Sequence, residues 1–372
     1  MSQPPVISRI LIVPGLPASS GRSQQSVNVE SISVGLVINK AQVTWGELRT
    51  DPETLAEMQQ KIVPLLDGRS LESCQTVLDE LDALTGTAVI SSPTPQPTAE
   101  KPASAISRRG FLFGKIESDS TADSSQQIRM ERPLPATIRS SVSQLILTAL
   151  ATAHDETVAE RIAAEYALPL RPAPVPIHLD INIADPLPDV SFLTHAIQSL
   201  GYTINDVAQL GPDGTNLQRF IRQLTNLLAQ VTEPDYRPII HLDVGGTLGQ
   251  LFDHNAGRML GALYGLEQVA APFPLRVVDA ALLPDATAQV ALMRQLMDYV
   301  RLRGMMLQLA ANQPIQSLAD VQVCVDGGAA HLLELSLSRL GSVQQTIRAI
   351  QSCQKRGVAV LLRDEEIGRA HV

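Results

Sequence analysis

The segment Arg237–Gly249, with sequence RPIIHLDVGGTLG, constrains the fold more than any other part of the chain. Within it, Ile239–Val244 is an apolar run in which His241 and Asp243 share one face and the aliphatic residues share the other. The run ends at two glycines, which mark a sharp exit from a strand. We therefore predict a buried strand with Asp243 at its carboxyl end, where parallel α/β folds hold ligands and metals.

Asp243 has two interpretations at this position. A carboxylate at the end of a buried strand costs free energy unless a cation or hydrogen-bond donors compensate it. It either binds a metal or ligand, or it caps the next turn by accepting backbone N–H groups. The strand alone favours neither.

A second segment repeats this pattern. IHLDI at Ile177–Ile181 is a near copy of IHLDV at Ile240–Val244, so His178 and Asp180 are predicted to point as His241 and Asp243 do. Two carboxylates at strand ends would then face one cavity.

Strands and helices alternate through the second half of the chain, which predicts a parallel barrel. Six strands fall short of the eight in a TIM barrel. The predicted strands are Val175–Ile181, Ile239–Val244, Leu275–Asp279, Val321–Asp326, Leu332–Leu337 and Val358–Leu362. The predicted helices between them include Leu217–Gln230, Asn255–Ala271, Thr287–Arg303 and Val343–Lys355.

The first half divides into three parts. Residues 1–90 contain strands at Ile7–Val13, Ile32–Ile38 and Ala41–Leu48 followed by helices at Pro52–Leu66 and Ser70–Ala83, an α+β pattern. Residues 91–135 are rich in Pro, Ser and Thr and are predicted to be a mobile insertion. In it, Arg108–Phe113 either docks a partner or is a short island in a linker. Helices in 136–170 then lead to the barrel domain, 171–372.

Composition limits the partners and the compartment. The net charge of −9 argues against nucleic acid or an anionic membrane as a partner. No apolar run approaches the roughly 20 residues of a membrane span, and the amino terminus lacks the pattern of a signal peptide. Three widely spaced cysteines suggest neither a disulfide framework nor a zinc site. We expect a cytoplasmic protein.

Several segments resemble one family in the same order along the chain. RPIIHLDVGGTLGQLFD resembles the HIDVYGTIG segment of methylaspartate ammonia-lyases, and ESISVGLVINKAQVTWGE resembles their ESISVLLVLEDGQVAHGD. The matches run from VPGLP to GVAVLL. The resemblance implies the enolase-superfamily architecture: an N-terminal α+β capping domain followed by a parallel TIM-like β/α barrel, here incomplete at the C-terminus. It also implies Mg²⁺, a homodimer, and elimination of ammonia from 3-methylaspartate or a similar amino diacid.

The family holds Mg²⁺ with three carboxylates from successive strand ends. The resemblance places Asp243 at the first position and Asp326 at the third. Val278 stands at the second, with Asp279 one residue later. Because adjacent strand residues face opposite sides, Asp279 could serve only if a bulge or break turned it inward.

The resemblance also assigns the bases and the substrate contacts. The family's His matches His195, on a helical stretch, and its Lys falls on Ser336 within HLLELSLSRLGS, which matches the family's HMVQIKTPDLGG. A serine cannot accept a proton at neutral pH without a partner base. Asp180 and Glu334 stand where the family has substrate-binding Gln residues.

Three functions follow. The first is the lyase, a carbon–nitrogen lyase acting on an amino diacid with Mg²⁺, and the second is another Mg²⁺-dependent α-proton abstraction with one base. The third is an inactive homologue that binds a small acid or pairs with an active subunit.

Finally, Glu366–Val372 (EIGRAHV) is what a common sequencing adapter encodes when read as coding DNA. We therefore expect the true frame to end near Asp364, the alternative being a genuine short tail with an open barrel edge.

Overall fold

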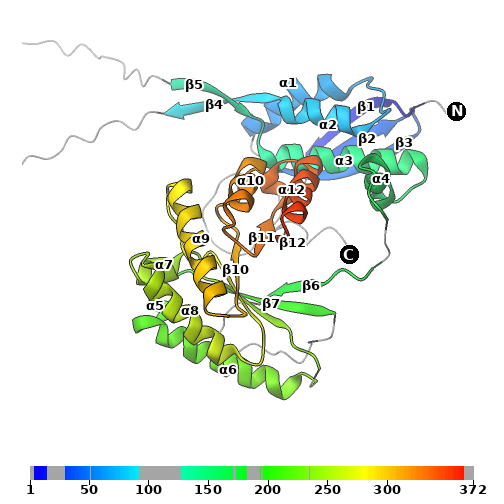
Figure 1. The fold of residues 1–372 in the computed structure, drawn as a ribbon. Coiled ribbons are helices and arrows are strands. Elements are labelled where there is room, and N and C mark those ends of the chain that lie inside the picture. The colour runs from blue at the N-terminus through cyan, green and yellow to red at the C-terminus, as the bar shows by residue number, and fades with distance from the viewer. Residues whose placement is uncertain are drawn as a thin grey trace, which may run out of the picture.

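The alternating strands and helices of the second half form a seven-stranded parallel sheet in the computed structural model (Figure 1). The structure describes residues 4–14, 30–50, 52–91, 127–170, 173–181, 193, 196–233 and 235–363. The strands are β6 (Ile177–Asp180), β7 (Ile197–Thr203), β8 (Ile239–Asp243), β9 (Leu275–Val278), β10 (Gln308–Ala311), β11 (Leu332–Leu335) and β12 (Ala359–Leu362). They lie side by side in the order of the sequence, so each crossover adds its strand at the same edge, as in a barrel.

Helices cover the convex face of this sheet and bury its aliphatic side chains in one core. They are α5 (Val207–Leu210), α6 (Thr215–Val231), α7 (Thr247–Leu251), α8 (Ala256–Ala270), α9 (Ala286–Leu302), α10 (Leu318–Gly327), α11 (Leu337–Leu340) and α12 (Val343–Lys355), with a 3₁₀ turn at Pro212–Gly214. The predicted fold class, an α/β barrel after an α+β domain, is confirmed as a curled, partial barrel.

Three barrel segments differ from the prediction. The predicted strand Val321–Asp326 is wrong: it lies in α10, which Ser317 caps by accepting the Asp320 N–H. Its sequence alternates like a strand, but Val321 and Cys324 are buried while Val323 is 50% exposed, the spacing of a helix face. Strands β7 and β10 were missed; the stretch containing His195 was predicted as helical, yet residues from Ile197 onward form β7.

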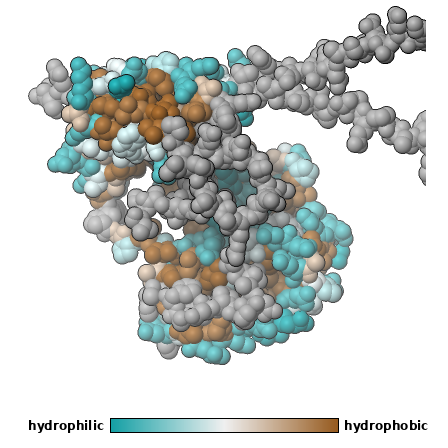
Figure 2. Space-filling view, turned by 180° about the vertical axis from the view of Figure 1, so that it is seen from behind, coloured by the Kyte–Doolittle hydropathy of each residue, from teal (hydrophilic) through white to brown (hydrophobic). Residues whose placement is uncertain are grey.

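The N-terminal unit is a three-stranded antiparallel sheet covered by helices on one face. It comprises β1 (Ile7–Pro14), β2 (Glu30–Ile38), β3 (Gln42–Thr50), α1 (Pro52–Leu66), α2 (Cys74–Ala83), α3 (Ala136–His154) and α4 (Val158–Glu165). Asn39 and Lys40 have φ of 51° and 60°, as the predicted tight hairpin requires. Seen from behind, the unit shows a hydrophobic area on its surface (Figure 2).

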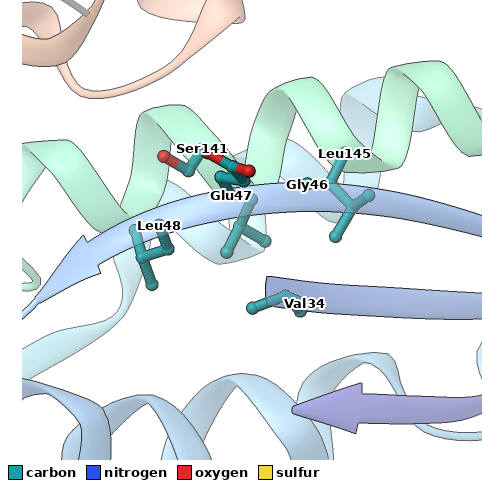
Figure 3. A pocket seen from close by; sticks show the side chains of 7 residues that line it. Val34, Gly46, Glu47, Leu48, Ser141 and Leu145 are labelled. Atoms are coloured by element: carbon teal, nitrogen blue, oxygen red, sulfur yellow. The ribbon is translucent and has the colours of Figure 1, made fainter. Parts of the chain in front are cut away.

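Gly46 leaves a small apolar pocket inside this unit, between β3 and α3 (Figure 3). Val34, Leu48 and Leu145 line it, and its one titratable lining residue, Glu47, is exposed. The pocket is a packing defect far from the strand ends of the barrel, not a site of chemistry.

Strands β4 (Thr85–Ser91) and β5 (Gln127–Pro133) pair antiparallel on either side of the predicted insertion. The predicted insertion, 91–135, includes β5, which completes a two-stranded ribbon with β4. Residues 92–126, including Arg108–Phe113, lie outside the described residues.

Polar contacts join the N-terminal unit to the barrel at the start of α12. The Asp82 carboxylate of α2 accepts from the Ser342 hydroxyl at 2.9 Å, from Gln345 at 2.9 Å and from Arg139 at 3.0 Å. This corner follows directly from β11 and α11, so the N-terminal unit fixes the loop that carries Ser336. Among the described helices, none combines the length and the apolar character needed to cross a membrane.

Candidate ligand site at the barrel mouth

A buried network fills the concave side of the sheet. His241 Nε2 of β8 lies 2.6 Å from Glu334 Oε1 of β11, and both side chains are almost fully buried. Two strands separate β8 from β11, so these side chains can meet only across the hollow of a curled sheet. Arg276 of β9 approaches His241 Nδ1 at 3.3 Å and binds Gln308 of β10.

The neighbours of His241 fix its tautomer. A guanidinium only donates, so Nδ1 accepts from Arg276 and Nε2–H donates to Glu334. Burial lowers the pKa of His241, which disfavours its charged form. Burial opposes ionisation of Glu334, but the His241 hydrogen bond and the Arg363 charge outweigh it and lower the pKa of that carboxyl. Neither ring nitrogen of His241 is left to act as a base.

Arg363, directly after β12, links the two edges of the sheet. Its guanidinium lies 2.9 Å from Asp180 at the end of β6 and 3.3 Å from Glu334. The Asp180 carboxylate also meets His178 Nε2 at 3.1 Å, and this hydrogen bond, with Arg363, lowers its pKa. His178 packs edge-on against His241, with ring centroids 4.6 Å apart. The histidines of the two IHLD segments are therefore in contact on one side of the sheet.

Asp243 lies at the end of β8, as predicted, and is 7% exposed. Its Oδ1 accepts the Gly245 N–H at 3.0 Å, which is the capping role that the sequence left open. Burial raises the pKa of its carboxyl.

Asp279 follows β9 with φ of 49°, so the strand does break at this residue. The break does not free the carboxylate for a ligand. Its two oxygens accept the backbone N–H groups of Asn312 at 2.9 Å and Gln313 at 2.8 Å. Burial raises the pKa of Asp279 to about 7. Asp279 therefore fastens the loop after β10.

Asp326 does not lie at a strand end, and its assignment as the third metal ligand is wrong. It is in α10, 64% exposed, and pairs with Arg356 at 2.9 Å. The third of the successive strand ends, after β8 and β9, is that of β10, and it carries the neutral Asn312. A carboxylate was assigned there because β10 was missed.

These donors do not fit the three-carboxylate Mg²⁺ site that the resemblance implies. Val278, at the second ligand position, packs in an apolar cluster with Ala310 and Leu332. The oxygens of Asp279 are held by backbone N–H groups, and Asn312 Oδ1 is held by Arg339. Across the described ranges, no group of three or more His, Cys, Asp and Glu side chains is placed to hold a metal ion.

Ser336 directly follows β11 and is 6% exposed. Its hydroxyl bonds the Ser338 hydroxyl at 2.8 Å, and no base contacts it within the described residues. His195 lies outside the described residues, so its predicted role stays a prediction. Arg339, three residues after Ser336, donates from Nη1 to the Asn312 carbonyl at 2.9 Å and from Nη2 to Asn312 Oδ1.

Sequence reasoning missed Arg276, Arg339 and Arg363. The signal for Arg276 was its parity with Val278 in LRVV, which places it on the concave face. Arg363 and Arg339 follow strands and have no local pattern that reveals their partners.

Comparisons with known proteins agree on one relationship. Residues 190–364 match the family model described as methylaspartate ammonia-lyase C-terminus. The chain is 29% identical over 235 residues to methylaspartate ammonia-lyase 2 of Carboxydothermus hydrogenoformans, covering 62% of this chain and 56% of that one. It is 26% identical over 370 residues to methylaspartate ammonia-lyase of Clostridium tetanomorphum, covering 92% and 77%. The chain thus spans little more than half the length of the first of these relatives.

Solved structures show the same fold. The β-methylaspartase of Clostridium tetanomorphum, in a Mg complex, superimposes with a TM-score of 0.71 at 23% identity, covering 95% of this chain and 86% of that one. A muconate cycloisomerase variant, from the enolase superfamily, gives 0.57 at 13% identity, covering 96% and 80%.

Proposed function

Because this chain is a methylaspartate ammonia-lyase-type protein with an enolase-superfamily fold, we propose that it binds a small acid at the barrel mouth without carrying out the metal-assisted elimination of ammonia. The strand ends that carry Asp180, Asp243, Glu334 and Ser336 form this mouth. The comparisons support the architecture, whereas the chemistry depends on a few side chains.

The hydroxyl pair of Ser336 and Ser338 carries the proposal. Proton abstraction from the carbon next to a carboxylate needs a base whose pKa lies near the working pH. A serine hydroxyl becomes basic only when a neighbouring base takes its proton. The partner of Ser336 is another hydroxyl, which cannot do so. Abstraction from that face of a substrate is therefore not available to this residue.

The second support is the charge around the mouth. A family-type reaction would rely on Mg²⁺ to stabilise the negative charge that forms on the substrate. The carboxylates here already have other partners: Asp180 and Glu334 bind Arg363, and Asp279 binds backbone N–H groups. We therefore propose that Mg²⁺ is not held at this position. Asp180 and Glu334 act on a bound ligand through Arg363.

The test is ammonia release from 3-methylaspartate by the purified chain, with and without Mg²⁺. We expect none above a blank in either condition. The lyase is the second candidate, favoured by relatives that are named methylaspartate ammonia-lyases. Mg²⁺-dependent release that disappears in His195→Ala would establish the lyase and overturn the proposal.

A gain-of-function variant makes the negative result informative. Ser336→Lys places the family's base on the same strand end, and Ser338→Lys is the matched control two residues away. Because the proposal also excludes Mg²⁺ from this position, we expect neither variant to release ammonia. Release by Ser336→Lys alone would show that only the missing base limits the reaction and would overturn the proposed absence of the metal. Folding of each variant is checked by its melting temperature.

The assembly and the compartment are also proposals. By analogy with the family, we propose a cytoplasmic homodimer; the alternative is a pairing with an active lyase subunit. Light scattering on the purified chain should give twice the monomer mass. A monomer that gains mass only when an active relative is added would favour the pairing.

A further inference from the structure

Arg339 is a partly buried cation at the barrel mouth whose role none of the preceding sections explains. Its guanidinium is bound by Asn312, through the backbone carbonyl and the side-chain oxygen. Both acceptors are neutral. Among the described residues, no carboxylate lies within ion-pair distance of Arg339, whereas Arg363 has two.

The position of Arg339 is fixed at adjacent strand ends. Asn312 directly follows β10, and its N–H bonds the Asp279 carboxylate that follows β9. Ser336 directly follows β11. The backbone N–H of Arg339 donates to the Ser336 carbonyl oxygen at 3.2 Å, which holds the backbone of Arg339 close to this strand end. The guanidinium therefore lies over the ends of β9 to β11, the region in which the resemblance would place a metal ion.

The sequence adds a second observation. HLLELSLSRLGS resembles the family segment HMVQIKTPDLGG, in which an Asp stands at the position of Arg339. The charge at this position is therefore reversed. At the end of β10, Asn312 likewise supplies an amide where the metal site would need a carboxylate. Both differences make this side of the mouth more positive.

The donors at this place suit an anion. A guanidinium has five N–H groups, and Asn312 uses one on each terminal nitrogen. The hydroxyls of Ser336 and Ser338 bond each other, so one of their two protons is left over. Guanidinium and carboxylate form strong paired hydrogen bonds, because both groups are planar and charged.

We propose that Arg339, with the Ser336–Ser338 hydroxyl pair, is the anchor for a carboxylate group of the ligand. It supplies the positive charge that a metal ion would supply at these strand ends. This inference rests on the proposed function, since it names the group that holds the small acid. The ligand class is a small carboxylic acid, and an amino group on it is not required.

The test measures binding by calorimetry with the full chain, using 3-methylaspartate and succinate as probes without added Mg²⁺. We expect both to bind, and Arg339→Gln to weaken both by about tenfold or more, as for loss of a charge-assisted pair. Arg356→Gln is the matched control, because Arg356 is exposed and pairs with Asp326 on α10. It should bind as the unaltered chain does.

Two further variants separate anchoring from folding. Arg339→Lys keeps the charge but loses the paired geometry, so its affinity should lie between those of the unaltered chain and Arg339→Gln. Ser338→Ala leaves Arg339 in place and should weaken binding by about tenfold, the effect of losing one hydrogen bond to a charged group. If Arg339→Gln does not fold, the Lys and Ala variants decide.

Three results would overturn the inference: no binding of either acid by the unaltered chain, unchanged affinity in the Arg339 variants, or an equal loss in Arg356→Gln. These results are independent of ammonia release. If the chain releases ammonia but its binding of both acids depends on Arg339, the proposed function is wrong and the role of Arg339 as carboxylate anchor still holds.

Discussion

Asp279→Asn should flatten the dependence of stability on pH. The Asp279 carboxyl is 1% exposed, and burial raises its pKa from 3.8 to about 7 against the effect of two backbone N–H donors. The nearby carboxylates Asp243 and Glu334 raise it further. An amide at this position has no proton to lose in that range. The comparison therefore isolates the titration of one buried group.

The sign follows from proton linkage. Because the pKa in the folded state lies above the value of 3.8 in the unfolded chain, the folded state holds the proton more tightly. This contribution to stability is fully present below about pH 4 and is lost as the pH rises through about 7. The two pKa values differ by about 3 units, and each unit corresponds to about 1.4 kcal/mol, so the full loss is about 4 kcal/mol.

Urea unfolding at pH 5 and pH 8 measures most of this window. The unaltered chain should lose about 3 kcal/mol of unfolding free energy from Asp279 between these values, and Asp279→Asn should not. Asp253→Asn is the control, because Asp253 also has a positive φ, 52°, but its side chain is 86% exposed. If the chain and Asp279→Asn change equally with pH, burial does not control this carboxyl and the reasoning is refuted.

Four other changes test separate parts of the structure. Tyr202→Phe should raise the unfolding free energy by roughly 1 kcal/mol, because the buried Tyr202 hydroxyl has no hydrogen-bond partner in the described part of the chain; a loss of stability in urea would contradict this. Gly46→Ala should add roughly 0.5 kcal/mol, since a Cβ there meets Leu145 at ordinary contact distance, 3.4 Å, and a lower melting temperature would show overpacking. Arg363→Gln should cost about 3 kcal/mol in urea unfolding, because it leaves buried Glu334 with one partner fewer. Mg²⁺ should not raise the melting temperature, and a rise that Asp243→Ala abolishes would restore the metal site.

Sequence reasoning predicted the ends of those strands that a local sequence pattern defines. Asp243 was placed correctly because alternation and a double glycine fix both the face and the end of β8. The break at Asp279 was stated as a condition and is present. What the carboxylate does after the break depends on the N–H groups of Asn312 and Gln313, 33 and 34 residues away, which no local pattern specifies.

The segment after α9 shows where period alone misleads. VQVCVD alternates over six residues, and a short alternating run on a helix cannot be told from a strand by period alone. The cap at Ser317 was the distinguishing signal, since a serine three residues before Asp320 is typical of a helix start. Because α10 was predicted as a strand, the short β10 was overlooked. Asp326 was therefore assigned to the third metal-ligand position, where the structure has Asn312.

The hydrogen-bond network inside the barrel could not be predicted from the sequence for a different reason. Its contacts join residues far apart in the sequence, such as His241 and Glu334, which are 93 positions apart. Sequence reasoning stated that a carboxylate at the end of a buried strand needs a cation or hydrogen-bond donors. It did not identify the arginines as that cation.

Those arginines explain how the fold persists without the metal-ligand set. Buried carboxylates destabilise a barrel unless each has a compensating partner. Here Arg363 compensates Asp180 and Glu334, while backbone N–H groups hold Asp279. Arg363 thus supplies inside the protein the positive charge that Asp180 and Glu334 need, whereas the charged form of Asp279 stays disfavoured by burial. Arg339, bound only by neutral oxygens among the described residues, is then a charge left at the strand ends for a ligand.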